Sequence, residues 1–278
     1  MRRSLSLLAA LLIAASPLSA WGRAGHILVS RMALKDLPPE VAPWFKGQED
    51  FFLEHSSDPD HWKNDRKEGP RHFIDAERYG GPANVPLDVQ EALAKVGAAS
   101  FAKGGQVPWV IQDRLRDLID AFKKGDPKQV AFLTTVLGHY IGDLHVPLHL
   151  TANHDGQDTG QKGVHSRWET GLVERFAREE SLEVQRAALE PDLFHAPWRW
   201  MKEAHALVPR LLEDDRMADR TSPEGAKGKV RGDAYWMIFR AQQGPVVQRQ
   251  LSRAGLHLAQ MILYAWALAG KPSVPRQG

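Results

Sequence analysis

The segment LGHYIGDLHVPLH, residues 137–149, places three histidines and one aspartate in a stretch that is otherwise mostly apolar. The run from 127 to 146 has the spacing of a buried helix, with a proline in its first turn and another just beyond its end. On such a helix His139 and Asp143 are four residues apart and project from one face. Burying an imidazole and a carboxylate among apolar side chains is unfavourable unless something pairs with both. The fold must therefore bring a partner to this helix.

A divalent metal ion is one such partner, because histidine nitrogen and carboxylate oxygen are common ligands of first-row metals. An ordinary ion pair between His139 and Asp143 would explain their spacing equally well. His165 and Glu169 repeat the same spacing on another predicted helix. Alone, this second pair would indicate a surface ion pair, but two such pairs separated by a loop favour metal binding.

The rest of the sequence predicts helices, and no segment alternates convincingly like a β-strand. Helices are expected at 25–37, 88–101, 110–125, 127–146, 164–177, 197–215, 228–243 and 246–270, with loops at 79–86 and 152–163. No internal repeat or low-complexity linker divides the chain. We therefore expect a single all-α domain over 21–270 and a C-terminal tail, 271–278.

The first twenty residues have the composition of a secretory signal peptide. Two arginines precede an apolar run from Leu5 to Ala15, and small residues with a proline lead to Ala20. The run is too short to span a membrane, and no later run approaches that length. We expect cleavage before Trp21 and a secreted or periplasmic protein with no transmembrane segment.

Charge and cysteine content limit what can bind and stabilise the mature chain. Removing residues 1–20 removes two arginines and no acid, so the formal charge at pH 7 falls from +2 to zero. A neutral chain gives no electrostatic argument for a nucleic-acid partner, although a local basic groove would not show in the average. The sequence has no cysteine. Core packing or bound metal must replace the disulfides of many exported proteins.

Further potential ligands lie in WGRAGH at the predicted mature N-terminus, in HSSDPDHWK and in RHFID. Each of these residues taken alone would be an ordinary loop or surface residue. Together with H-x-x-G-D-x-H-x-P-L-H and H-x-x-W-[DE], in this order from residue 21 to about 176, they resemble the zinc-dependent phospholipase C/P1 nuclease superfamily. The resemblance implies an all-α bundle of that type with a trinuclear zinc site, which hydrolyses phosphoester bonds with water that the metal ions activate.

The resemblance also implies which residues bind the three zinc ions. The ligands carried over are Asp60, His72 and His139 for the first ion, Trp21 and His26 for the second, Asp143 as a bridge between these two, and His149, His165 and Glu169 for the third. Trp21 would bind through its carbonyl oxygen and its α-amino nitrogen, whose lone pair becomes available only after the signal peptide is removed. Asp60 and Asp143 are also expected to be catalytic.

The early aspartate has an alternative. Asp58 is two residues away, but Asp60 precedes Lys63 by three residues, as in the family motif W-A-D-x-x-[RK]. We therefore choose Asp60. His145, His55 and His61 are given no ligand role and are expected beside the site or at the surface.

The superfamily has nuclease and phospholipase branches, and features of both are present. The five-residue step from Trp21 to His26 resembles the nuclease branch, whereas Glu169, the short loop before His165 and the lack of cysteine resemble the bacterial phospholipases. We expect a nuclease-like phosphodiesterase acting on single-stranded nucleic acid or nucleotide phosphoesters, with no stable protein partner. A phospholipase C acting on phospholipid head groups is the alternative, and a non-catalytic secreted zinc-binding protein is the second.

Base stacking would need an aromatic side chain beside the metal ions. Phe73, Tyr79 and Trp168 are candidates, and each is equally plausible as a core residue. A zinc peptidase is disfavoured because no H-E-x-x-H occurs.

Overall fold

The computed structural model describes residues 21–62, 65–222 and 231–275. The predicted signal peptide and the last three residues of the predicted tail lie outside these ranges. The described residues contain no β-strand, only an isolated antiparallel bridge between Ile74 and Gly105. The prediction of an all-α fold is therefore confirmed. None of the helices described is both long enough and apolar enough to cross a membrane.

The helices differ widely in length. They are α1 Gly22–Asp36, α2 Glu49–Glu54, α3 Asp58–His61, α4 Val89–Val96, α5 Ala98–Lys103, α6 Val107–Lys124, α7 Pro127–Leu144, α8 Val164–Ser166, α9 Leu172–Phe176, α10 Ala196–His205, α11 Val208–Thr221 and α12 Asp233–Leu268. A π-helical turn, Arg167–Gly171, joins α8 to α9. Short 3-10 turns include Gly69–His72, between α3 and α4, and Pro147–Leu150, after α7.

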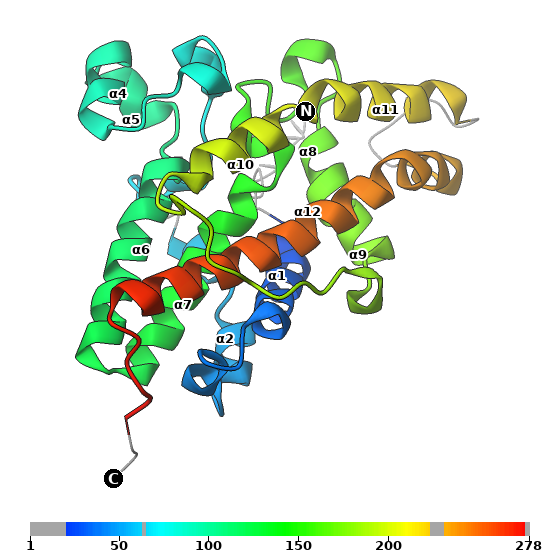
Figure 1. The fold of residues 1–278 in the computed structure, drawn as a ribbon. Helices are drawn as coiled ribbons and strands as arrows, with labels where there is room; N and C mark the ends of the chain where they lie inside the picture. The colour runs from blue at the N-terminus through cyan, green and yellow to red at the C-terminus, as the bar shows by residue number, and fades with distance from the viewer. Residues whose placement is uncertain (1–20, 63–64, 223–230, 276–278) are drawn as a thin grey trace, which may run out of the picture.

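Helix α12 crosses the molecule diagonally and packs on α1, α6, α7 and α11 (Figure 1). Helix α7 packs against α1, α6 and α12, so nearly all of its length is buried. One hydrophobic cluster surrounds α6, α7, α10 and the C-terminal half of α12, and a second lies around α1, α9, α11 and the N-terminal half of α12. The face of α7 that carries His139 and Asp143 is therefore enclosed by helices that are distant in sequence.

Local signals set the ends of α7 close to where the sequence predicts them. The Asp126 carboxylate accepts hydrogen bonds from the Lys128 and Gln129 amides, each 3.1 Å long, and so caps the N-terminus. Gly125 has a φ of 66°, the left-handed conformation that ends α6 immediately before this cap. The helix stops at Leu144, and Pro147 starts the next turn.

Several predicted boundaries are wrong. The predicted helices 228–243 and 246–270 form one helix, α12, with Pro245 inside it. Buried residues on both sides of this proline, such as Phe239 and Val247, pack against the second hydrophobic cluster, and this packing outweighs the lost hydrogen bond. The predicted helices 88–101, 164–177 and 197–215 are each divided, at Gly97, at the π-helical turn and at 206–207.

Two glycines in α12 provide a matched test of its packing on α1. A Cβ atom at Gly255 would lie 2.4 Å from Met32 Cβ and 3.2 Å from the Ala33 nitrogen, whereas at Gly244 its nearest neighbour would be Arg240 Cγ at 3.4 Å. We expect Gly255→Ala to lower the free energy of unfolding by about 1–3 kcal/mol, because the two helices must separate. Gly244→Ala should change it by less than about 1 kcal/mol, because the gain from replacing a helical glycine is offset by contact between the new Cβ and Pro245. Urea unfolding of both variants measures this, and equal effects would contradict it.

Candidate metal centre

The structure brings histidine and carboxylate side chains together in three groups that could each hold a metal ion. Within each group the potential ligand atoms lie within 4.8 Å of one another. The first group is Asp60, His72 and His139, the second is His26, His139 and Asp143, and the third is His149, His165 and Glu169. All side chains except Asp60 are classed as buried. The side-chain ligands expected from the sequence are thus all adjacent to another expected ligand.

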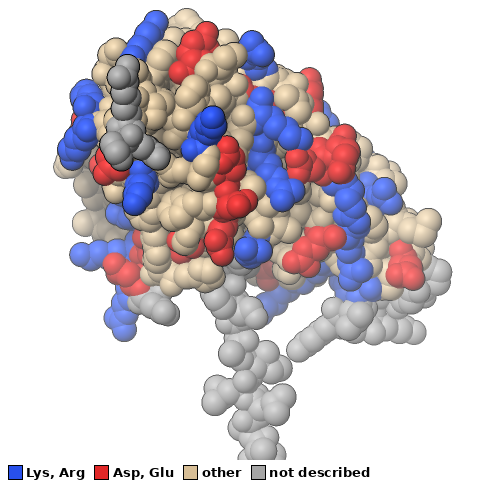
Figure 2. Space-filling model, turned by 90° about the horizontal axis from the view of Figure 1, so that it is seen from below, with Lys and Arg blue, Asp and Glu red and all other residues tan. Residues whose placement is uncertain are grey.

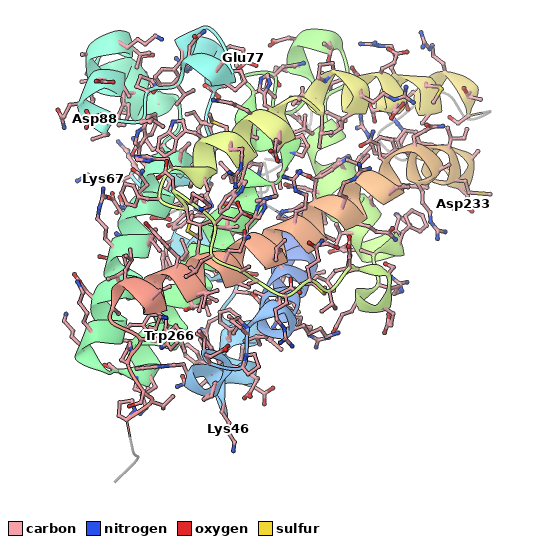
Figure 3. The ribbon with its side chains drawn as sticks, viewed as in Figure 1. Lys46, Lys67, Glu77, Asp88, Asp233 and Trp266 are labelled. Atoms are coloured by element: carbon pink, nitrogen blue, oxygen red, sulfur yellow. The ribbon has the colours of Figure 1, made fainter. Side chains whose placement is uncertain are left out.

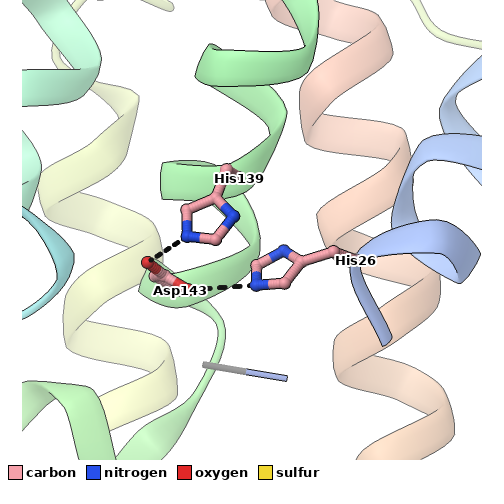
Figure 4. A group of neighbouring side chains, drawn as sticks. All are labelled: His26, His139 and Asp143. Carbon is pink, nitrogen blue, oxygen red and sulfur yellow. Dashed lines mark ion pairs between the residues drawn. The ribbon is translucent and has the colours of Figure 1, made fainter. Parts of the chain in front are cut away.

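Asp143 lies at the centre of the first two groups. Its Oδ2 atom is 2.8 Å from His72 Nδ1 and 3.4 Å from His139 Nε2, and its Oδ1 atom is 3.6 Å from His26 Nε2. The His26 and His139 rings are stacked, with centroids 3.9 Å apart. Figure 4 shows both rings directed at the two oxygens of this one carboxylate from α1 and α7. A carboxylate placed in this way can bridge two metal ions.

Asp60, and not Asp58, faces this cluster. The Asp60 Oδ1 atom is 3.5 Å from His139 Nε2 and 3.8 Å from His72 Nδ1. Asp58 instead pairs with His55, with 2.7 Å between Oδ2 and Nδ1, and both side chains are about one-third exposed. The short helix α3 places the two aspartates on different sides, because they are two residues apart on a helix.

The outer nitrogens of two rings are held by backbone carbonyls. His139 Nδ1 lies 3.0 Å from the Ser56 oxygen, and His149 Nδ1 lies 2.7 Å from the His72 oxygen. Because an oxygen acceptor requires an N–H, the proton of each neutral ring is on Nδ1, and the lone pair of Nε2 points into the cluster. Both histidines are therefore oriented and in the tautomer that binds a metal.

Glu68 lies behind the His72 ring and was not expected from the sequence. Its Oε1 atom is 3.4 Å from His72 Nε2 and accepts a hydrogen bond from the Tyr140 hydroxyl. A carboxylate behind a ligating histidine fixes the orientation of the ring and raises its basicity. The signal was available, because Glu68 and His72 have the same four-residue spacing as the two pairs that were recognised.

The third group is held on the segment that begins with α8. Glu169 Oε2 is 2.9 Å from His165 Nε2 and 3.4 Å from His149 Nε2. Glu169 lies in the π-helical turn, one residue after Trp168. The hydrogen bond from His149 Nδ1 to the His72 carbonyl oxygen connects this group to the first two.

Burial and the neighbouring charges act on these groups in opposite directions. Burial alone would raise the pKa of Asp143, but His139 and His72 hold it well below its ordinary value. Burial likewise opposes ionisation of Glu169, yet His165 and His149 lower its pKa. Burial lowers the pKa of His26 to about 3, so this ring is neutral at pH 7. Ionised carboxylates beside a neutral imidazole form a donor set suited to a divalent cation.

Unsatisfied buried atoms indicate that the cluster fits metal ions. Both ring nitrogens of His26, Oδ1 of Asp143, Nε2 of His149 and Nδ1 of His165 have no hydrogen-bond partner within the described part of the chain. Such orphaned polar atoms are rare in folded proteins and call for an explanation such as a bound ion. Three of these atoms, His26 Nε2, Asp143 Oδ1 and His149 Nε2, face another side chain of the cluster, so the donor chemistry fits first-row divalent metals.

Trp21, the first described residue, packs directly beside this cluster. Its ring is fully buried, donates from Nε1 to the Gly142 oxygen at 2.6 Å, and lies 5.1 Å from the Trp168 ring. A Cβ atom at Gly142 would meet both His26 Nδ1, at 3.1 Å, and Trp21 Cδ1, at 3.4 Å. Glycine at this position therefore lets α7 approach the start of α1.

Other residues weighed in the sequence lie elsewhere. His145 turns away from the cluster, where its Nε2 atom is 2.8 Å from His257 Nδ1. Tyr79 and Trp168 are buried against other aromatic rings and belong to the core. Phe73, the remaining stacking candidate, lines a cavity beside the metal groups.

This cavity has a volume of about 530 Å³ and opens onto the first group, through His72, and onto the third group. Besides His72, His149 and His165, its walls include apolar Pro70, Phe73 and Leu148 and the cationic residues Arg78 and Lys103. Arg78 and Lys103 were not expected from the sequence, because no local motif distinguishes them from other surface cations.

Glu77 fixes one wall of the cavity (labelled in Figure 3). Its carboxylate accepts hydrogen bonds from Thr151 Oγ1 at 2.7 Å and from the Ala152 amide at 2.9 Å. These bonds and that of His205 outweigh partial burial and lower the pKa of Glu77 to about 2. The loop that follows His149 is thereby held over the cavity.

Comparison with known proteins agrees with this geometry. A model of the S1/P1 nuclease family matches residues 21–266. The chain belongs to the S1/P1 nuclease family. Membership of this family agrees with the phosphoester hydrolysis that the sequence predicts. Comparison with curated protein sequences gave no significant match.

Among solved structures, the alpha toxin from Clostridium absonum has a similar fold. The TM-score is 0.51 at 16% sequence identity, and the match covers 94% of this chain and 66% of the toxin chain. The chain thus spans slightly less than two thirds of the toxin. At this identity the likeness concerns the fold, and it supports the predicted phospholipase C/P1 nuclease type of all-α bundle.

We expect Asp143→Asn to abolish hydrolysis and lower thermal stability together, because one carboxylate serves both the first and the second groups. Zinc affinity should fall at least about 100-fold, and stabilisation by bound metal falls with it. Zinc analysis, thermal unfolding and turnover test this. Asp58→Asn, which alters a neighbouring carboxylate outside the cluster, should leave all three quantities unchanged. An Asp143→Asn protein with full zinc content and turnover would refute the bridging role.

Proposed function

We propose that this protein is a zinc-dependent nuclease that cleaves single-stranded nucleic acid or nucleotide phosphoesters after export and removal of residues 1–20. The observation that carries the proposal is the opening of two metal-ligand groups into a cavity with both an aromatic and cationic lining. Three zinc ions would be held by Asp60, His72 and His139; by Trp21 and His26; and by His149, His165 and Glu169, with Asp143 as the bridge.

Backbone and side-chain groups of the protein prepare this site before substrate arrives. Ser56 and His72 fix the tautomers of His139 and His149 through their carbonyl oxygens. Asp143 stays ionised because the surrounding histidines lower its pKa. When bound, the metal ions would activate water and stabilise the negative charge that develops on a phosphoester. Preorganised ligands avoid the energetic cost of rearranging the site during the reaction.

Features of the cavity favour nucleic acid over a neutral substrate. Phe73 offers a ring face next to His72, and stacking on a base is independent of sequence. Lys103 and Arg78 supply positive charge at the same cavity, although Arg78 also pairs with Asp75 at 2.7 Å. On the face of the molecule in Figure 2, basic and acidic residues are interspersed. Attraction for a polyanion would therefore depend on local cations and not on a broad field.

Phospholipase C activity is the second candidate. The apolar part of the cavity wall, Pro70, Phe73 and Leu148, would suit the glycerol or acyl portion of a phospholipid. The same metal groups would serve either phosphodiester. The two functions therefore differ in what the cavity wall contacts.

Incubating the zinc-loaded protein that begins at Trp21 with single-stranded DNA and with phosphatidylcholine vesicles separates the candidates. We expect cleavage of the DNA and little release of head group.

Phe73→Ala should raise KM for DNA about 5- to 100-fold, in line with the loss of one stacking contact. Zinc content should stay unchanged and serves as the internal control, because Phe73 is not one of the proposed ligands.

Other outcomes of this experiment also decide between functions. Preferential hydrolysis of the vesicles would replace the nuclease by the phospholipase. Three bound zinc ions without turnover of any phosphoester would favour the non-catalytic zinc-binding protein.

The proposed role of the Trp21 amine gives a separate prediction. A protein with one extra glycine before Trp21 should bind the second zinc ion at least about tenfold more weakly, because an amide nitrogen has no lone pair to donate. Its buried tryptophan ring can still pack as before, so thermal unfolding without zinc is the control and should not change. Isothermal titration with zinc measures the affinity. Equal affinities in the two proteins would exclude the amine as a ligand.

A further inference from the structure

The π-helical turn that carries Glu169 is held from behind by residues far along the chain. Arg167 and Trp168 lie between His165 and Glu169, and both side chains point away from the metal groups into α11 and α12. A π-helical turn is uncommon and is often found at functional sites. Its shape here must be maintained by contacts outside the turn, because the short α8 and α9 flank it with only a few residues each.

The first set of contacts is a buried ion pair between the turn and α11. The Arg167 guanidinium binds both oxygens of Asp215, Nε to Oδ1 and NH2 to Oδ2, each at 2.9 Å. Asp215 is fully buried and also accepts hydrogen bonds from the Tyr235 hydroxyl of α12 and from Gln161 Nε2. A bidentate arginine–carboxylate pair fixes orientation as well as distance.

Arg167 also binds the backbone of the loop that precedes α8. Its NH1 and NH2 groups donate to the Lys162 and Gln161 oxygens, both at 3.1 Å. One guanidinium therefore connects the loop before His165, the turn that carries Glu169, and helix α11.

The second set of contacts extends from Trp168 into α12. Its Nε1 atom donates to Gln243 Oε1 at 2.9 Å, and Gln243 Nε2 donates to Asp214 Oδ2 of α11 at 2.7 Å. The opposite side of Trp168 packs on Trp21. Gly171 permits close contact with α12 at the end of the turn, because a Cβ atom there would lie 2.3 Å from Trp236.

We propose that Arg167 and Trp168 are positioning residues, and that their buried links to α11 and α12 hold the π-helical turn in the shape that lets His165 and Glu169 share one metal ion with His149. The inference rests on the proposed ligand set and assigns a role to the C-terminal third of the chain, which supplies none of the ligands. It predicts that binding of the third ion can be weakened without weakening the binding of the first two. Those are held by residues of α1, α3 and α7 and the turn before Phe73.

The test is Asp215→Asn in the full protein that begins at Trp21. The amide keeps the size of the side chain but leaves Arg167 without its charge partner. Supporting residues behind metal ligands typically change metal affinity about 10- to 100-fold. We therefore expect the third zinc to bind at least about tenfold more weakly. After dialysis against a weak chelator, the zinc content should fall from three ions per chain to two.

Asp219→Asn is the matched control. Asp219 also lies on α11 and pairs with a largely buried arginine, Arg231, with 2.7 Å between Oδ2 and Nη2. Arg231 lies over the Tyr235 ring, but the Asp219 carboxylate itself makes no hydrogen bond to the π-helical turn within the described residues. This variant should retain three ions, even if its thermal stability falls as much as that of Asp215→Asn. Unchanged zinc affinity in Asp215→Asn, or equal weakening of all three ions, would overturn the positioning role.

If Asp215→Asn fails to fold by circular dichroism, Tyr235→Phe provides the measurement. It removes only the hydroxyl that donates to Asp215, and the third zinc should still bind severalfold more weakly. Unchanged affinity there would also overturn the inference. Zinc binding is measured without substrate, so loss of the third ion in a protein that cleaves no nucleic acid would refute the nuclease and leave the positioning role standing. A protein that binds no zinc would overturn both.

Discussion

The burial of the Asp143 carboxylate among three histidine rings is the interaction on which the arrangement of this protein depends. A buried anion requires compensation, and the rings that provide it come from α1, from α7 itself and from the turn before Phe73. Each of these segments must therefore approach one face of α7. The close packing of α12 against α1 and α7 holds the segments in place.

The rings around Asp143 are in turn oriented by groups that lie behind them. Backbone carbonyls hold the outer nitrogens of His139 and His149, and Glu68 stands behind His72. These partners set ring orientation, and through it the direction of each lone pair. Among the atoms left without hydrogen bonds are His26 Nε2, Asp143 Oδ1 and His149 Nε2, which face other proposed ligands. Stability and chemistry are thus coupled, because the groups that are costly to bury are also the proposed metal ligands.

The helices after residue 176 contribute no ligand to these groups, yet they shape the site. Asp215 and Gln243 reach the turn beside Glu169 through Arg167 and Trp168. This arrangement places the third group on a segment with its own support, whereas the first two groups share Asp143. The cavity lined by Phe73 lies where these two parts of the site meet.

The sequence by itself determined the all-α class, the position of α7 and the pairing of His139 with Asp143 and of His165 with Glu169, because helical periodicity and four-residue spacing are local properties. It could not determine that Pro245 lies inside a continuous helix, since packing on both sides of the proline decides this. The tertiary structure places Asp60, which the family motif already favoured over Asp58, beside the cluster, and it alone revealed Glu68, Arg78 and Lys103 beside the site. These depend on which distant segments meet, and no spacing along one segment encodes such contacts.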